Sequence, residues 1–199
     1  IYLVSCATTF TPDVHLRDNL KNSGMSIKLL RSAFFTQGIV FSPDSKYLLS
    51  GNEDKTLKLW DIPTGKMVKQ FIGHSAPVLS VAFSPDGRYA VSGGDKGEIK
   101  VWDITTGKEI RQFKHSGWVI SVAFSPDGKY VLSGSYAPWA PRSNADKSIK
   151  LWDIVTGREI RQIVGHSGWV HGRFSPDGGY ILSGSTDKTI KLWEVSTGR

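Results

Sequence analysis

Apolar and β-branched residues along this chain form short runs of four to six positions, separated by Ser, Pro, Asp and Gly. In one segment the first run is followed by Ser84-Pro85-Asp86-Gly87, where Pro and Gly favour a tight reversal of the backbone. The pattern predicts strands at 78–83, 89–92, 99–102 and 109–113, with a second turn at 106–108. No segment sustains a helical period, so the chain is predicted to be all-β.

The pattern repeats along the chain. Phe-Ser-Pro-Asp occurs four times, starting at Phe41, Phe83, Phe124 and Phe174. The pair Trp-Asp, Glu in the last copy, starts at Trp60, Trp102, Trp152 and Trp193, with Trp spacings of 42, 50 and 41. Nine extra residues between Ser135 and Asp146 account for the longest spacing. A period of about 41 lies in the range of four-stranded propeller blades.

Over residues 25–199 these motifs, together with Gly73-His74 and Gly165-His166, resemble the WD40-repeat family. The resemblance implies a β-propeller of four-stranded antiparallel blades that serves as a rigid, non-enzymatic platform for protein partners. The blades are expected at about 33–65, 74–107, 115–157 and 166–198, after an N-terminal segment at 1–24.

In that family a blade often carries a hydrogen-bonded tetrad of His, Ser or Thr, Asp and Trp. By position, the third blade offers His115, Ser133, Asp146 and Trp152, and the fourth His166, Ser183, Asp187 and Trp193. The second offers His74, Ser92 and Trp102 with Lys96 in place of Asp; the first offers Ser50, Asp54 and Trp60 with Ser32 in place of His. The first two blades are therefore expected to lack the full network.

The head of the repeat region matches an outer strand. Met25–Ser32 aligns in step with Met67–His74, and family propellers commonly close by pairing such a strand with the last blade. Because such propellers usually close with six to eight blades, we expect these four to be completed by further blades or by self-association of chains.

Composition limits the function classes. The apolar content of 39% suits a soluble domain, and no run approaches the roughly 18 apolar residues that a membrane span needs. A single cysteine, Cys6, excludes a disulfide framework and a thiolate metal cluster. The net charge of +7 permits anionic partners. Nucleic-acid binding is not favoured, since no aromatic-basic cluster of the RNA-binding type occurs.

The repeated Ser, His and Asp favour a structural role over a hydrolase triad, because a catalytic constellation is unique and these recur beside a Trp. The only short-spaced histidine pair, His166 and His171, lacks nearby carboxylate support for a metal. No cofactor is therefore expected. Lys58, Lys100, Lys150 and Lys191 are expected to lay their stems along a neighbouring blade, with the ammonium groups in water.

Two features point to a partner surface. Trp118 and Trp169 follow Ser-Gly in the loops between outer and inner strands, with Leu79, Ile120 and His171 expected on the same surface. The insertion 136–145 interrupts one blade on the same face and holds Tyr136, Trp139 and Arg142, residue types enriched in interface hot spots. The alternatives are Trp side chains packed on adjoining loops and an insertion folded on itself.

Leu3-Val4-Ser5-Cys6 resembles a bacterial lipobox, with a lipid anchor at Cys6; the alternative is a short strand with an ordinary cysteine. The sequence does not fix the location: the cytoplasm is expected without a lipobox, and the bacterial cell envelope with one. The leading function is a scaffold for protein–protein interaction through the loop face. A regulatory segment of a larger enzyme is the alternative, and a propeller that uses its central pore for catalysis or ligands ranks last.

Overall fold

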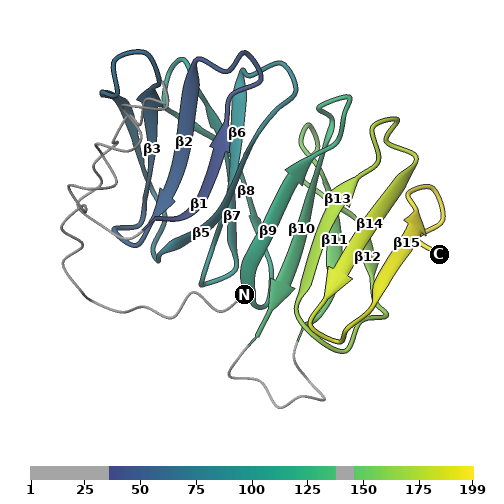
Figure 1. Cartoon of the computed structure of the whole chain (residues 1–199). Coiled ribbons are helices and arrows are strands. Elements are labelled where there is room, and N and C mark those ends of the chain that lie inside the picture. Colours follow the sequence, from purple (N-terminus) through teal and green to yellow (C-terminus); the bar gives the residue numbers. More distant parts are fainter. Residues whose placement is uncertain (1–35, 138–145) are drawn as a thin grey trace, which may run out of the picture. The chain divides into compact units, whose positions relative to one another are not determined.

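The computed structural model describes residues 36–137 and 146–199, which form fifteen strands and no helix (Figure 1). The strands make four antiparallel sheets that follow one another in chain order. Sheet A contains β1 (Thr36–Phe41), β2 (Tyr47–Asn52), β3 (Thr56–Asp61) and β4 (Met67–Ile72). Sheet B contains β5 (Val78–Phe83), β6 (Tyr89–Gly94), β7 (Glu98–Asp103) and β8 (Glu109–Lys114).

Sheet C contains β9 (Trp118–Phe124), β10 (Tyr130–Tyr136), β11 (Ile149–Asp153) and β12 (Glu159–Ile163). Sheet D contains β13 (Val170–Phe174), β14 (Tyr180–Ser185) and β15 (Ile190–Glu194), so it has three strands among the described residues. The strand predicted at 25–32, the lipobox reading at Cys6, and Trp139 and Arg142 of the insertion all lie outside the described residues.

The Ser and Asp side chains of the Ser-Pro-Asp motif make the hydrogen bonds that close the turn between the first and second strands. In sheet B the hydroxyl of Ser84 donates to the carboxylate of Asp86 over 2.6 Å, and the amide of Tyr89 donates back to Ser84 Oγ over 2.9 Å. Gly87 takes the left-handed φ of 71° that closes the turn. The first copy has Ser45 at this position, with a φ of 58°. One local network therefore sets all four reversals.

Each sheet packs face to face on the next through apolar side chains. The cluster between sheets B and C, for example, joins Val91, Ile99 and Val101 of one sheet to Val122, Phe124 and Trp152 of the next. Equivalent clusters join A to B and C to D. The sheets therefore share three apolar junctions and no separate core.

Glycines let the inner strand of one sheet approach the preceding sheet. A Cβ on Gly51 would lie 2.7 Å from Val78 Cγ1, and one on Gly93 would collide with Val119. A Cβ on Gly134 would collide with the carbonyl oxygen of Val170. All three glycines stand at the same position of the second strand, because the junction there has no room for a side chain.

Lysine and arginine side chains of the outer strands donate hydrogen bonds to the next sheet. Arg111 donates from Nε and Nη2 to the carbonyl oxygens of Ile154 and Val155, each over 2.8 Å. Lys69 and Arg161 make the equivalent bonds across the junctions from A to B and from C to D. The outer strands of sheets A, B and C are therefore each hydrogen-bonded to carbonyl groups in the turn after the third strand of the next sheet.

Candidate functional site

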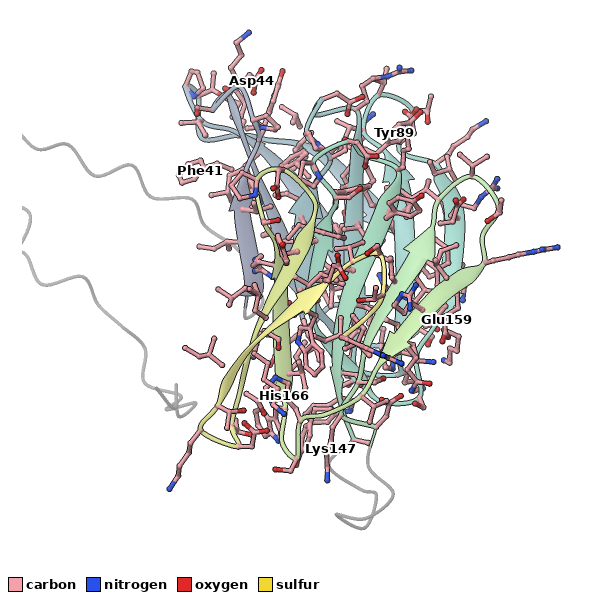
Figure 2. All side chains as sticks on the ribbon, turned by 90° about the vertical axis from the view of Figure 1, so that its right-hand side faces the viewer. Phe41, Asp44, Tyr89, Lys147, Glu159 and His166 are labelled. Carbon is pink, nitrogen blue, oxygen red and sulfur yellow. The ribbon has the colours of Figure 1, made fainter. Side chains whose placement is uncertain are left out.

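One end of the sheets carries all the connections from second to third strands and from outer to inner strands; we call it the loop edge. It consists of residues 53–55, 73–77, 95–97, 115–117, 164–169 and 186–189, with 137 and 146–148 of the interrupted connection. Figure 2 shows His166 and Lys147 at this end and Asp44 and Tyr89 at the other.

Three aromatic side chains gather at the loop edge of sheets C and D. Tyr136 is the cross-strand partner of Trp118, and their ring centroids lie 6.2 Å apart in an edge-to-face arrangement. The ring centroids of Tyr136 and Trp169 lie 4.2 Å apart, at an interplanar angle of 35°. Tyr136 thus bridges the two sheets. We call these three residues the aromatic cluster.

The backbone around the cluster is held from both sheets. Trp169 donates its amide to Thr186 Oγ1 over 2.9 Å, and the amide of Thr186 donates to the carbonyl of Trp169 over 3.2 Å. A Cβ on Gly117 would lie 2.6 Å from the carbonyl oxygen of Tyr136, and one on Gly168 would collide with Thr186. The Gly before each Trp is therefore required by close backbone approach. Trp169 itself remains 38% exposed.

The residues after Trp118 and those after Trp169 pair differently with the second strand of their sheets. In sheets A, B and C the inner strand contains a bulge, which leaves Ile120 of sheet C and Leu79 of sheet B outside the ladder. The inner strand of sheet D is shorter than the other three and has no bulge. His171 therefore pairs with Gly184 and takes the position that Ser121 holds in sheet C. His171 and Ile120 therefore occupy different positions of the ladder.

The fourth-sheet tetrad forms a continuous network. Trp193 Nε1 donates to Ser183 Oγ over 2.7 Å, and that hydroxyl lies 2.8 Å from His166 Nε2. His166 Nδ1 lies 2.8 Å from Asp187 Oδ2. Hydrogen bonds from Thr189, and further ones from the backbone of Ser167 and from His166, hold the pKa of Asp187 well below its usual range. The network ties the loop edge to the third strand.

In the second sheet a different residue completes the tetrad, so the expectation of an incomplete network there is wrong. Glu98, two positions after Lys96, places Oε2 3.2 Å from His74 Nδ1 and accepts from the amide of Ser75 over 2.9 Å. His74 Nε2 lies 2.6 Å from Ser92 Oγ, which also accepts from Trp102 Nε1 over 2.8 Å. The glutamate side chain is one methylene longer than that of aspartate, so its carboxylate reaches the histidine from this position.

The third and first sheets depart from the full network. In sheet C, Trp152 donates to Ser133 over 2.8 Å and His115 Nδ1 lies 3.0 Å from Asp146 Oδ2, but the buried His115 Nε2 has no hydrogen-bond partner among the described residues. The pKa of Asp146 lies far below its usual range: desolvation would raise it, but hydrogen bonds from His115, Ser116 and Ser148 outweigh that effect.

In sheet A, Trp60 donates to Ser50 over 2.9 Å, and the buried amide of Asn52 donates to the same hydroxyl over 3.4 Å. Asp54 instead pairs with Lys58 over 2.5 Å, and the position of Ser32 lies outside the described residues. Sequence reasoning missed Glu98 and Asn52. For Glu98 the signal available was a carboxylate two positions after Lys96, which stands where Asp was expected; for Asn52 it was a polar residue two positions after the tetrad serine Ser50.

The four lysines before the Trp residues are bound within the protein. Lys58 and Lys100 are buried, and Lys100 lies 2.7 Å from Glu109. Lys150 pairs with Glu159 over 2.9 Å, and Lys191 donates to the carbonyl of Gly165 over 2.7 Å. The expectation that these ammonium groups reach water is therefore wrong for Lys58 and Lys100, whose side chains are buried against carboxylates.

Histidines of the tetrads are shielded from solvent. Burial lowers the pKa of His74 to about 4, against the opposing attraction of Glu98, so the imidazole is neutral at physiological pH. His171 belongs to no tetrad and is exposed, and partial desolvation together with the neighbouring Arg173 lowers its pKa. A neutral imidazole suits a hydrogen-bond relay between Ser and a carboxylate.

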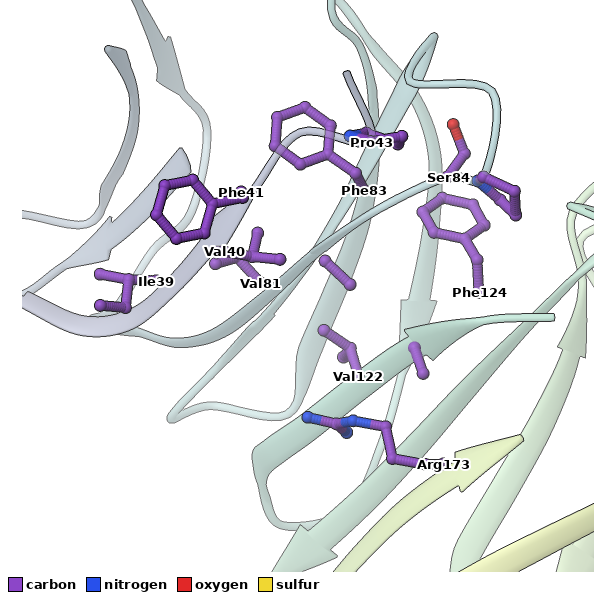
Figure 3. Close-up of a pocket in the computed structure, with 13 residues that line it drawn as sticks. Ile39, Val40, Phe41, Pro43, Val81, Phe83, Ser84, Val122, Phe124 and Arg173 are labelled. Atoms are coloured by element: carbon purple, nitrogen blue, oxygen red, sulfur yellow. The ribbon is translucent and has the colours of Figure 1, made fainter. Parts of the chain in front are cut away.

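The inner strands line an open apolar pocket of about 380 Å³ (Figure 3). Its lining is mainly aliphatic and aromatic, and includes Phe41, Phe83, Phe124, Val81, Val122 and one cation, Arg173. Within residues 36–137 and 146–199 no group of three His, Cys, Asp or Glu side chains could hold a metal ion. The same residues contain no helix long and apolar enough to cross a membrane.

Repeated antiparallel sheets joined face to face, each with a Trp that donates a hydrogen bond to a Ser of the second strand, define a β-propeller of WD repeats. The model of the WD40 family (WD domain, G-beta repeat) matches residues 36–61, 65–103, 107–153 and 157–194, so the chain belongs to this family. The solved structure of the computationally designed Ika4 protein is 32% identical and superposes with a TM-score of 0.70, covering 84% of this chain and 96% of that one.

Curated relatives share shorter segments. The general transcriptional corepressor TUP1 of Saccharomyces cerevisiae is 36% identical over 50 residues, 25% of this chain and 7% of that protein. Protein Atg16l2 of Homo sapiens is 34% identical over 93 residues, 41% of this chain and 14% of its own length. The chain therefore spans only a small part of the relatives it matches.

Proposed function

We propose that this chain is a scaffold that binds another protein through the aromatic cluster of Trp118, Tyr136 and Trp169. One observation carries the proposal: the three rings come from two sheets and meet at the loop edge, where Trp169 remains 38% exposed. Large aromatic side chains on a rigid support lose little entropy on binding, which makes them effective anchors.

The charges around the cluster favour an acidic partner segment. Lys96 and Lys188, in the connections between second and third strands of sheets B and D, are exposed. Asp187, directly before Lys188, is occupied by His166, and Glu98, two positions after Lys96, is occupied by His74, whereas Asp95 lies directly before Lys96. Lys188 therefore presents a cation at the loop edge whose adjacent carboxylate is engaged internally, and an apolar anchor flanked by Asp or Glu would complement it.

The family supports the scaffold role. WD repeats hold variable loops on a stiff stack of sheets, and here the tetrads of sheets B and D tie those loops to the third strands. TUP1 is described as a transcriptional corepressor, a role that fits a protein that works through partners. The repeated Ser, His and Asp are engaged in those structural networks, which favours a non-enzymatic function.

The test is a selection of phage-displayed random 12-residue peptides on the immobilised chain, followed by titration of the enriched peptides. We expect peptides with an aromatic or large aliphatic residue flanked by Asp or Glu. Trp169→Ala and Tyr136→Ala should weaken their binding by at least about tenfold, as for a hot-spot residue. The melting temperature of Trp169→Ala should stay close to that of the unchanged chain.

Val155→Ala is the matched control, because Val155 is an exposed apolar residue at the opposite end of sheet C. Its peptide affinities should equal those of the unchanged chain. Peptides that bind both cluster variants with unchanged affinity would contradict the proposal, and so would a selection without enrichment.

A further inference from the structure

Each sheet has two apolar faces with a fixed set of positions. We call the face that packs on the next sheet in the chain the following face, and the one that packs on the sheet before it the preceding face. In sheet C the following face carries Ala123, Tyr130, Leu132, Ile149, Leu151 and Ile163. Its preceding face carries Val119, Val122, Phe124, Val131, Trp152 and Ile154.

The following face of sheet D is apolar and uncovered. Tyr180, Leu182, Ile190 and Leu192 hold the positions of Tyr130, Leu132, Ile149 and Leu151, yet they are between 44% and 76% exposed. In sheet C the last three of those positions are at most 2% exposed. A contiguous apolar face of this kind marks an interaction surface.

The preceding face of sheet A is uncovered in the same way. Ile39 and Phe41 hold the positions of Val122 and Phe124, but they are 66% and 63% exposed. Their counterparts in sheet C pack in the junction with sheet B. The exposure of both faces shows that sheets A and D do not cover each other within one chain.

The glycine positions show what shape fits the following face of sheet D. Gly51, Gly93 and Gly134 each face the inner strand of the next sheet at a distance that leaves no room for a Cβ. Gly184 is the fourth member of this series, and a Cβ there would meet no atom within 4 Å. Sheet D thus has the same recess for an inner strand, and the recess is empty.

We propose that the following face of sheet D in one copy of this chain packs on the preceding face of sheet A in a second copy. The two faces carry the residue types and positions that already pack together three times within the chain, from A to B, B to C and C to D. A partner built from these repeats therefore fits without a new mode of packing.

The contact joins two different surfaces, so a pair of chains related by a twofold axis forms it twice and closes into a ring. Arg173 is the charged residue at the inner margin of the sheet D face. Its Nη1 donates to Ser121 Oγ over 2.9 Å and to the carbonyl of Gly172 over 2.8 Å, so the guanidinium turns back toward sheet C. The surface is separate from the aromatic cluster and stands independently of the proposed function.

The first test is the solution mass of the 199-residue chain by light scattering. We expect a discrete dimer of about 44 kDa, twice the chain mass of 21.9 kDa. A monomer at concentrations of tens of micromolar would overturn the proposal, since it would mean that the two faces do not bind each other. A series of increasing oligomer masses would mean open-ended association and would overturn the proposal of a closed dimer.

Paired variants distinguish a contact between unlike faces from one between like faces. Leu182→Glu places a charge on the sheet D face and Phe41→Glu one on the sheet A face, and both residues are exposed in the single chain. Each variant alone should be monomeric. An equimolar mixture should form a one-to-one dimer through the intact D face of one and the intact A face of the other.

If the Phe41→Glu chain remained dimeric by itself, the sheet D faces would bind each other and the proposal would be wrong. Gly184→Val tests the recess, because the added side chain fits the single chain but collides with an incoming strand. We expect it to shift the dimer to monomer. Gly179→Val, where a Cβ meets only the side chain of Asp177 at 3.6 Å, is the control and should leave the dimer intact.

Discussion

Sheets B and D carry apolar residues at the same strand positions, but only sheet B is covered by a following sheet. In sheet B, Val91 and Ile99 are fully buried under sheet C. In sheet D, Leu182 and Ile190 hold the same positions and lie open. The difference shows that a repeat specifies two apolar faces, whereas burial of each face depends on whether a neighbour is present.

The largest expected effect is on the Trp of each sheet. Trp102 is 1% exposed, packs edge-on against Phe71 and donates to Ser92, so Trp102→Ala should lower the free energy of unfolding by about 3–5 kcal/mol. Trp193 is only half-buried, and Trp193→Ala should cost clearly less. Urea unfolding followed by far-UV circular dichroism measures both, and equal losses would refute the contrast.

Acid should destabilise sheet B through His74. Its pKa of about 4 in the folded chain lies below the 6.5 of an exposed histidine, so the unfolded chain binds more protons between these values. The stabilisation is complete above pH 6.5 and declines as the pH falls toward 4. Between pH 6.5 and 5 we expect a loss of about 2 kcal/mol.

Urea unfolding at a series of pH values measures this loss; His74→Gln should remove the His74 part of the dependence and leave the part that the lowered pKa of His171 contributes. The carboxylates with lowered pKa, such as Glu98 and Asp146, affect stability at lower pH and do not interfere. An NMR titration provides a check without substitution, because the His74 ring should stay neutral until about pH 4. Protonation near pH 6.5 would contradict the assignment.

Glu98 should matter where Lys96 does not. Glu98→Ala leaves His74 Nδ1 and the amide of Ser75 without their acceptor, at a cost of about 1–3 kcal/mol. Lys96→Ala should change the free energy of unfolding by less than about 0.5 kcal/mol, since the Lys96 side chain is exposed. Thermal and urea unfolding of both variants measure these losses. Similar losses of stability in the two variants would contradict the assignment of Glu98 to the tetrad.

The smallest expected effect concerns the first turn. Ser45 has a φ of 58°, whereas the other three copies have Gly at this position. Ser45→Gly should stabilise the chain by about 0.5 kcal/mol, because relief of left-handed strain slightly exceeds the added entropy of the unfolded chain. A matched Gly87→Ser change in sheet B should destabilise by a similar amount. Differential scanning calorimetry measures both; a loss of stability in Ser45→Gly or a gain in Gly87→Ser would contradict the account.

Most of the fold was predictable from sequence. The repeat period, the Ser-Pro-Asp turns and the strand at 78–83 follow from local patterns, and the all-β propeller of WD repeats is confirmed. The site was predictable in part: Trp118, Trp169 and Tyr136 were candidates, but their meeting depends on how sheet D packs beside sheet C. Glu98 as tetrad member and the missing bulge at His171 were not expected, because side-chain reach and strand register are set by neighbours in space.

The sequence by itself determined the four repeats, the turn at each Ser-Pro-Asp and the apolar faces of each sheet, since these depend on local backbone preferences and on the two-residue period of strands. Only the tertiary structure decided which lysines are buried and which rings stack. It also showed that Leu182, Ile190 and Gly184 remain uncovered where their counterparts are packed. Packing between sheets joins residues about 40 positions apart, and no local pattern encodes the distance between their side chains.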